Sequence, residues 1–283
     1  MSGLRMRSAR TGECDLFWAM ATARSVVLNG DLGSGKSTVS LLLAQRLGIR
    51  RISVGDLYRD MAKQRGMTAL QLNLHAELDD KIDFYVDRLQ SDIAASGEQL
   101  VVDSRLAWFF FRDAVKVHLI TDPAVAAQRV LGRPADTVES YGSVEEARER
   151  LASRSESERT RFLSRYGADK TRLRNYDIVC DSTSASPDEI VERIAGNLTA
   201  PRAETMLYID PRRIVADPQS DAGPIRLGYA RPHFFAVSGH DQIAEAAGRG
   251  QTLIEATLAA EGEEWTGATT GSRRRTVRAT HES

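Results

Sequence analysis

The stretch GDLGSGKS, residues 30–37, fits the pattern G-x-x-x-x-G-K-[ST] at every required position. Residues 25–29 before it, SVVLN, are typical of a buried strand, and residues 37–47 after it are typical of a helix that ends at Gly48. In this arrangement, backbone N–H groups and a helix N-terminus surround phosphate oxygens. We therefore predict a P-loop that binds a nucleoside triphosphate.

The side chains of this loop have predicted roles of their own. Lys36 reaches the β- and γ-phosphates, and the hydroxyl of Ser37 ligates Mg²⁺. The predicted ATP contacts are Gly30, Asp31, Leu32, Gly33, Ser34, Gly35, Lys36, Ser37 and Thr38. The alternative, a glycine-rich turn that precedes a helix by chance, requires strand, loop, Lys-Ser and helix to coincide in order. The loop identifies the phosphate donor and leaves the acceptor open.

Composition and charge narrow the class of protein. The chain has 283 residues, 42% of them hydrophobic, and a formal net charge of −1, so no overall charge favours nucleic acid or anionic membrane. No apolar run approaches the ~20 residues that span a bilayer. Glu13 and Asp15 interrupt any secretory signal, and Cys14 and Cys180 show no metal-ligand spacing. We expect a cytoplasmic protein in which Cys180 is a reduced core thiol.

Segments with strand and helix patterns alternate between residues 25 and 198. This alternation predicts an α/β fold: a three-layer parallel sheet with helices on both faces. The predicted helix N-caps are Ser53, Asp122, Ser143 and Ser186. The predicted parts are a loose extension over 1–22, a P-loop domain over 23–200, a small α/β module over 205–263 and a disordered tail over 264–283. The true start is Met1 or Met20.

A kinase for a small acceptor needs cations for the acceptor's anionic group, cations over the transferring phosphoryl group and a lid that excludes water. Arg59, one turn into a predicted helix, and Arg105, just after a predicted strand, are suited to hold an acceptor phosphate. Asp103, at the end of that strand, is suited to orient the acceptor or to hold Mg²⁺ through water. A surface role is the alternative for each arginine.

An arginine-rich helix begins after Ser143. Arg150, Arg154, Arg161 and Arg165 fall on one face at offsets of four, seven and four, and Arg159 lies close to that line. They outnumber the acidic residues on their own face, which predicts a phosphate-facing lid. The alternative is a solvated helix with i,i+4 pairs such as Glu146–Arg150.

Ordered blocks of residues resemble the cytidylate kinase family of nucleoside monophosphate kinases, especially its archaeal-type branch. The resemblance runs from Arg24 to Ile194 and rests on residues 30–39, 53–67, 101–107, 154–167 and 176–179. It implies a helical lid and transfer of the ATP γ-phosphate to CMP or dCMP with Mg²⁺. It implies that Arg59 and Arg105 hold the acceptor, and that Arg154, Arg159 and Arg161 belong to the lid as catalytic residues with Lys36.

The chain also departs from this family. Ser104 stands where the family usually has glycine, and an aromatic run, residues 108–111, follows at once. These departures motivate an alternative, a P-loop kinase for a modified nucleotide or a specialised metabolite. Residues 205–261 resemble, more weakly, the N-terminal module of ParB and sulfiredoxin-like proteins, through residues 209–215 and 238–247. This second resemblance and the arginine-rich tail motivate another alternative, a nucleotide-switched regulatory protein that binds DNA.

Overall fold

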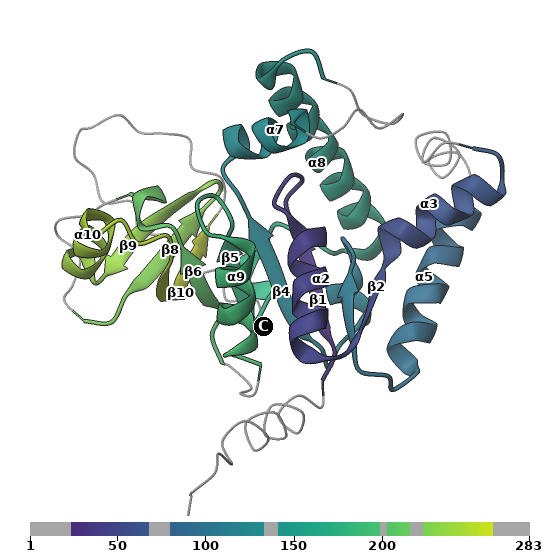
Figure 1. The fold of residues 1–283 in the computed structure, drawn as a ribbon, viewed down its shortest axis with the longest axis horizontal. Helices are drawn as coiled ribbons and strands as arrows, with labels where there is room; N and C mark the ends of the chain where they lie inside the picture. The colour runs from purple at the N-terminus through teal and green to yellow at the C-terminus, as the bar shows by residue number, and fades with distance from the viewer. Residues whose placement is uncertain (1–23, 68–79, 133–140, 199–202, 216–222, 263–283) are drawn as a thin grey trace, which may run out of the picture.

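The computed structural model describes residues 24–67, 80–132, 141–198, 203–215 and 223–262. Their strands form one sheet in the order β2-β3-β1-β4-β5-β6-β10-β8-β9-β7 (Figure 1). The strands are β1 (Val26–Gly30), β2 (Arg50–Ser53), β3 (Leu100–Asp103), β4 (Val115–Ile120), β5 (Ile178–Asp181), β6 (Met206–Ile209), β7 (Ile214–Val215), β8 (Arg226–Ala230), β9 (His233–Ser238) and β10 (Ile254–Gly262). The helices are α2 (Lys36–Leu47), α3 (Val54–Gln64), α5 (Asp80–Ala95), α6 (Ala107–Phe110), α7 (Pro123–Leu131), α8 (Val144–Tyr166), α9 (Pro187–Ala195) and α10 (His240–Gly248), with short 3₁₀ turns η1 (Leu173–Asn175) and η2 (Pro211–Arg213).

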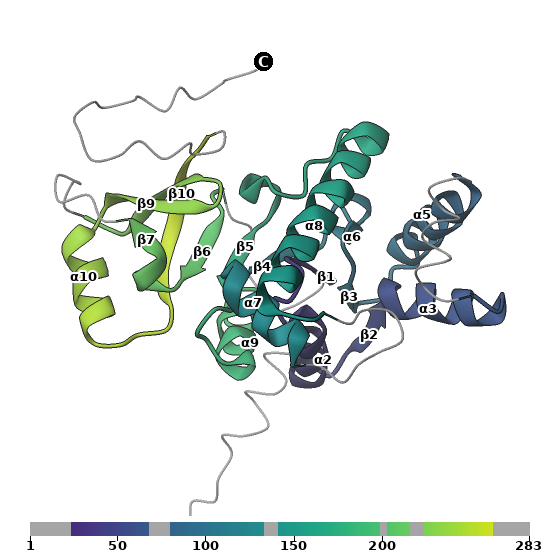
Figure 2. The same cartoon turned by 90° about the horizontal axis from the view of Figure 1, so that it is seen from above.

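The first five strands run parallel and are covered on both faces, as the alternating pattern predicts. Figure 2 shows α2 and α9 on one side of these strands and α6 and α8 on the other. Two apolar cores lie between the sheet and these helices. Because both faces are buried, the strands read as apolar runs rather than as alternating patterns. The predicted three-layer α/β fold is therefore confirmed.

Local sequence signals place the helices. Each of the four predicted N-caps accepts a hydrogen bond from a backbone N–H of the first helical turn, at 2.8–3.2 Å. Gly48 ends α2 at a left-handed φ of 67°, as the sequence predicts for this stop. Caps and stops depend on neighbours within four residues, so the sequence alone defines them.

The strands of residues 206–262 continue the sheet of the P-loop region. β6 pairs in parallel with β5, placing Leu207 beside Val179, and β10 then pairs antiparallel with β6. Cys180 lies fully buried between β4 and β6, and burial raises the pKa of its thiol, which fits a structural role. Division of the chain at residue 200 stays a prediction, whereas the sheet itself is continuous.

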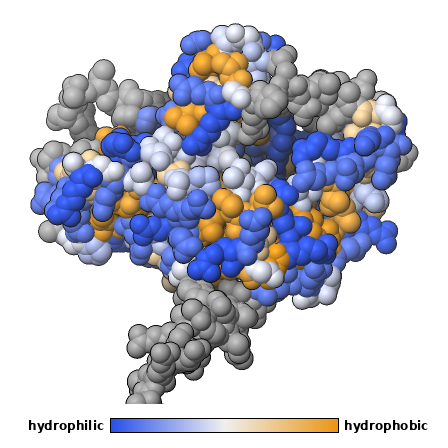
Figure 3. All heavy atoms as spheres, viewed as in Figure 1, coloured by the Kyte–Doolittle hydropathy of each residue, from blue (hydrophilic) through white to orange (hydrophobic). Residues whose placement is uncertain are grey.

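Several predicted features fall on residues outside those described. These are the extension over 1–22 with Met20, and the tail over 264–283. Within the described residues, no helix is both long enough and apolar enough to cross a membrane. Figure 3 shows a largely hydrophilic face with scattered apolar patches, and the apolar side chains that remain exposed include Leu41 of α2.

Candidate active site

The P-loop has the backbone geometry that its glycines predict. Gly33 and Gly35 have left-handed φ values of 82° and 79°, which only glycine adopts without strain. A Cβ at Gly33 would lie 2.9 Å from the backbone of Ala126, and one at Gly30 would lie 2.9 Å from the carbonyl oxygen of Leu119. The loop is therefore packed tightly against α7 and the end of β4, and α2 begins at Lys36 with its N-terminus at the loop.

Lys36 is held by a buried carboxylate at the end of β3. Its Nζ lies 2.6 Å from Oδ1 of Asp103, and the guanidinium of Arg51 lies 2.8 Å from Oδ2. Burial alone would raise the pKa of Asp103, but the charges of Lys36 and Arg51 outweigh it and hold this pKa below its usual range. Burial lowers the pKa of Lys36, and Asp103 opposes that shift. The P-loop lysine is thus fixed in place and paired.

A second cluster surrounds Glu158 of α8, whose side chain is only 8% exposed. Arg105 donates to Oε1, which also lies 3.4 Å from Nε of Arg154, while Nζ of Lys170 lies 2.9 Å from Oε2. Burial would raise the pKa of Glu158, yet these three cations lower it to about 2. One carboxylate of α8 therefore faces three cations.

The two clusters are close enough to interact electrostatically. The charges of Arg105 and Glu158 act on the pKa of Lys36, in addition to the charge of Asp103. Arg59 of α3 is connected to the first cluster: it donates to Asp56, which also accepts from Arg51 at 3.2 Å. The structure thus connects the predicted residues Lys36, Asp103, Arg105, Arg154 and Arg59.

The remaining lid arginines have other partners. Arg159 lies 3.2 Å from Asp169 and 3.0 Å from Glu156, and the guanidinium of Arg161 lies over the Phe162 ring. Both stay predicted lid residues. Several arginines of α8 are paired in the structure: Arg150 with Glu146 on the same helix, and Arg159 and Arg165 with Asp169 and Asp87 outside it. Spacing along one helix does not reveal those acids.

Ser104 and the aromatic run are largely buried. The hydroxyl of Ser104 donates to Oε1 of Gln90 at 2.8 Å, and Ser104 is 5% exposed. Trp108 and Phe111 belong to the core on the α8 side, whereas Phe109 is 39% exposed. The hydroxyl of Ser104 therefore binds to α5, and most side chains of the aromatic run lie in the core.

A neutral network lies beneath the loop. The Asn29 amide donates to the hydroxyl of Tyr176 and lies 3.1 Å from Nδ1 of His118. Burial, with the charges of Lys170 and Lys36, lowers the pKa of His118 to about 3. His118 is therefore uncharged at neutral pH and has a structural role beneath the P-loop.

Magnesium would depend on few protein ligands. No group of three or more His, Cys, Asp or Glu side chains within the described ranges is arranged to hold a metal. Ser37 is exposed in the first turn of α2, so its hydroxyl is free to meet a solvated ion. Both oxygens of Asp103 already contact cations, so this carboxylate fits contact with Mg²⁺ only through water.

The P-loop region of this chain is similar to known kinases. Residues 26–170 match the protein family described as AAA domain. The cytidylate kinase of Natronomonas pharaonis is 38% identical over 180 residues, which cover 62% of this chain and 91% of that protein. The cytidylate kinase of Methanobrevibacter smithii is 33% identical over 173 residues, which cover 61% of this chain and 97% of that protein. A solved structure of shikimate kinase from Bacteroides thetaiotaomicron matches with 15% identity and a TM-score of 0.46, covering 62% of this chain and 99% of that one.

Proposed function

Because this chain belongs to the cytidylate kinase family, we propose that it transfers the γ-phosphoryl group of ATP to CMP or dCMP. The chain is a nucleoside monophosphate kinase with its P-loop at residues 30–37. The identity of the acceptor base is the proposal, together with the residue roles below.

The observation that carries the proposal is the convergence of cations from separate elements on one site. Lys36 starts α2, Arg105 follows β3, Arg154 lies on α8 and Lys170 follows α8. Phosphoryl transfer spreads negative charge over the transferring group, so its catalysis depends on positioned positive charge. A donor and an acceptor that both carry phosphates would find cations for both in this arrangement.

In the proposed reaction, backbone N–H groups of the P-loop and Lys36 hold the donor phosphates. The Ser37 hydroxyl would ligate Mg²⁺, which supplies charge neutralisation between the β- and γ-phosphates. Arg59 and Arg105 hold the acceptor phosphate, and Asp103 orients the acceptor. Arg154, Arg159 and Arg161 close over the transferring group, and positioning and electrostatics suffice without a covalent intermediate.

A panel of all common nucleoside monophosphates and their deoxy forms tests the acceptor. With full-length protein, ATP and Mg²⁺, we expect the highest kcat/KM on CMP or dCMP, measured by coupled ADP release. If the protein turns over only a different nucleotide, the proposed acceptor base is wrong. Failure to turn over any of them, by protein that binds ATP, would favour a different small acceptor.

Arg59→Ala is expected to raise the KM for CMP about tenfold and to change the KM for ATP little. Its guanidinium is 58% exposed and pairs with Asp56, so it is available to a charged ligand without being part of the core. Arg88→Ala is the matched control, because Arg88 is 72% exposed and its partner Asp92 lies on its own helix. Equal CMP KM values for the two variants would remove Arg59 from the acceptor site.

A further inference from the structure

We propose that Arg213 is a positioning residue for the donor side of the active site. It lies in η2, beyond the segment 26–170 that matches the family. The proposal rests on the proposed function only in taking a nucleoside triphosphate as the ligand of the P-loop. Through Arg213, the C-terminal strands would help to hold the loop that binds the donor.

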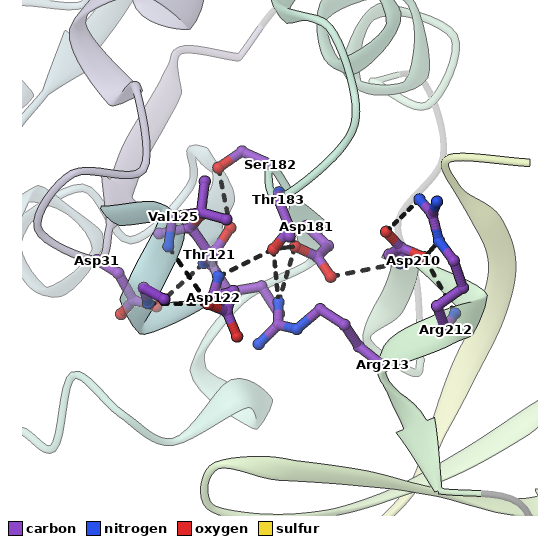
Figure 4. A network of polar contacts seen from close by, with 12 residues as sticks. Asp31, Thr121, Asp122, Val125, Asp181, Ser182, Thr183, Asp210, Arg212 and Arg213 are labelled. Carbon is purple, nitrogen blue, oxygen red and sulfur yellow. Dashed lines mark hydrogen bonds and ion pairs between the residues drawn. The ribbon is translucent and has the colours of Figure 1, made fainter. Parts of the chain in front are cut away.

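Arg213 neutralises a buried carboxylate at the end of β5 (Figure 4). Its Nη1 lies 2.8 Å from Oδ1 of Asp181 and 3.1 Å from Oγ1 of Thr183. Asp181 is fully buried, and the backbone N–H of Asp210 donates to its other oxygen at 3.3 Å. A buried carboxylate requires such partners, so the local structure after β5 depends on Arg213.

The loop after β5 in turn holds the start of α7. Oγ1 of Thr183 accepts a hydrogen bond from the backbone N–H of Asp122 at 2.9 Å. Arg129 of α7 donates to the carbonyl oxygens of Ser182, at 2.6 Å, and of Thr183, at 3.3 Å. Asp122 is the N-cap of α7, so the helix is fixed at its first turn and again along its length.

The start of α7 and the end of β4 contact the P-loop itself. Gly33 packs on Ala126 so closely that no side chain fits, and the N–H of Thr121 donates to Oδ2 of Asp31 at 3.4 Å. The contacts therefore run without a break from Arg213 to the second residue of the P-loop (Figure 4).

Loss of Arg213 would leave Asp181 buried without its cation. The loop after β5 would then rearrange, and the support of α7 for the P-loop would weaken. Because a preformed loop binds phosphate without a cost of ordering, the expected loss is in donor affinity. The acceptor residues Arg59 and Arg105 take no part in these contacts, so acceptor binding is expected to be retained.

The proposal is tested by isothermal titration calorimetry, in which the full-length protein is titrated with ATP to measure its affinity. We expect Arg213→Ala to weaken ATP binding about five- to tenfold, with the KM for the acceptor within twofold of wild type. Arg213→Lys, which keeps a charge near Asp181, should recover part of the affinity. Arg249→Ala is the matched control: Arg249 follows α10, is 68% exposed, and pairs with Glu245, which is itself 57% exposed.

The double variant Asp181→Asn, Arg213→Ala covers the case in which Arg213→Ala does not fold. It removes the buried charge with its partner, so it should fold, yet it lacks the bond to Thr183 and should still bind ATP weakly. ATP affinity within twofold of wild type in a folded variant would overturn the proposal. Equal losses of binding of ATP and of the acceptor would also overturn the proposal. Because ATP binding is measured directly, failure to phosphorylate CMP would count against the proposed function alone.

Discussion

Lys36→Ala is expected to lower kcat about a thousandfold, with a smaller effect on the binding of the acceptor. The ammonium of Lys36 is positioned by Asp103 at 2.6 Å and is the P-loop's own cation for the β- and γ-phosphates. The fold should survive, because Arg51 still neutralises Asp103 from 2.8 Å. The measurement is steady-state phosphoryl transfer, with circular dichroism to confirm the fold.

Lys63→Ala provides the control for this prediction, since Lys63 is exposed near the end of α3. It should keep wild-type kcat and KM. Folded Lys36→Ala protein with kcat within tenfold of wild type would contradict the proposed role of the P-loop, and with it the proposed reaction.

Local signals in the sequence predicted most of the elements of the parallel region. The motif at residues 30–37, the caps and the apolar runs each depend on near neighbours, and the structure has them where the sequence placed them. Lys36 was predicted from the P-loop motif, Asp103 and Arg105 from a strand end, and Arg154 from a helix face. The structure connects these residues through shared charges.

Partners from distant parts of the chain were not predicted. Arg51 reads as part of a short strand, yet it shares Asp103 with Lys36. Glu158 reads as one acid within an arginine-rich helix, and Lys170 follows that helix without any motif, yet they pair at 2.9 Å. Such pairs depend on how elements pack, and no spacing within a single element encodes them.

The same reason applies to the C-terminal strands. Residues 205–263 were predicted to form a small module, but the pairing of β6 with β5 depends on a sheet edge that only the fold reveals. Leu207 and Ile209 are fully buried there. The C-terminal strands therefore contribute to the apolar core of the P-loop region. The same packing brings Arg213 near the P-loop.

Glu158→Gln is expected to lower the free energy of unfolding at pH 7 by about 3 kcal/mol. The variant leaves Arg105, Arg154 and Lys170 without their common carboxylate. Glu156→Gln is the control on the same helix: Glu156 is 50% exposed, and its loss should cost less than about 1 kcal/mol. Urea unfolding of the three proteins measures both differences.

The pH dependence separates the charge of Glu158 from its packing. Its pKa is about 2 in the folded protein against a reference value of 4.5, so its contribution is complete above pH 4.5 and is lost as the pH falls toward 2. The difference between wild type and Glu158→Gln should therefore narrow by about 1 kcal/mol from pH 7 to pH 4. An unchanged difference would show that the charge of Glu158 contributes nothing to stability, and would contradict this prediction.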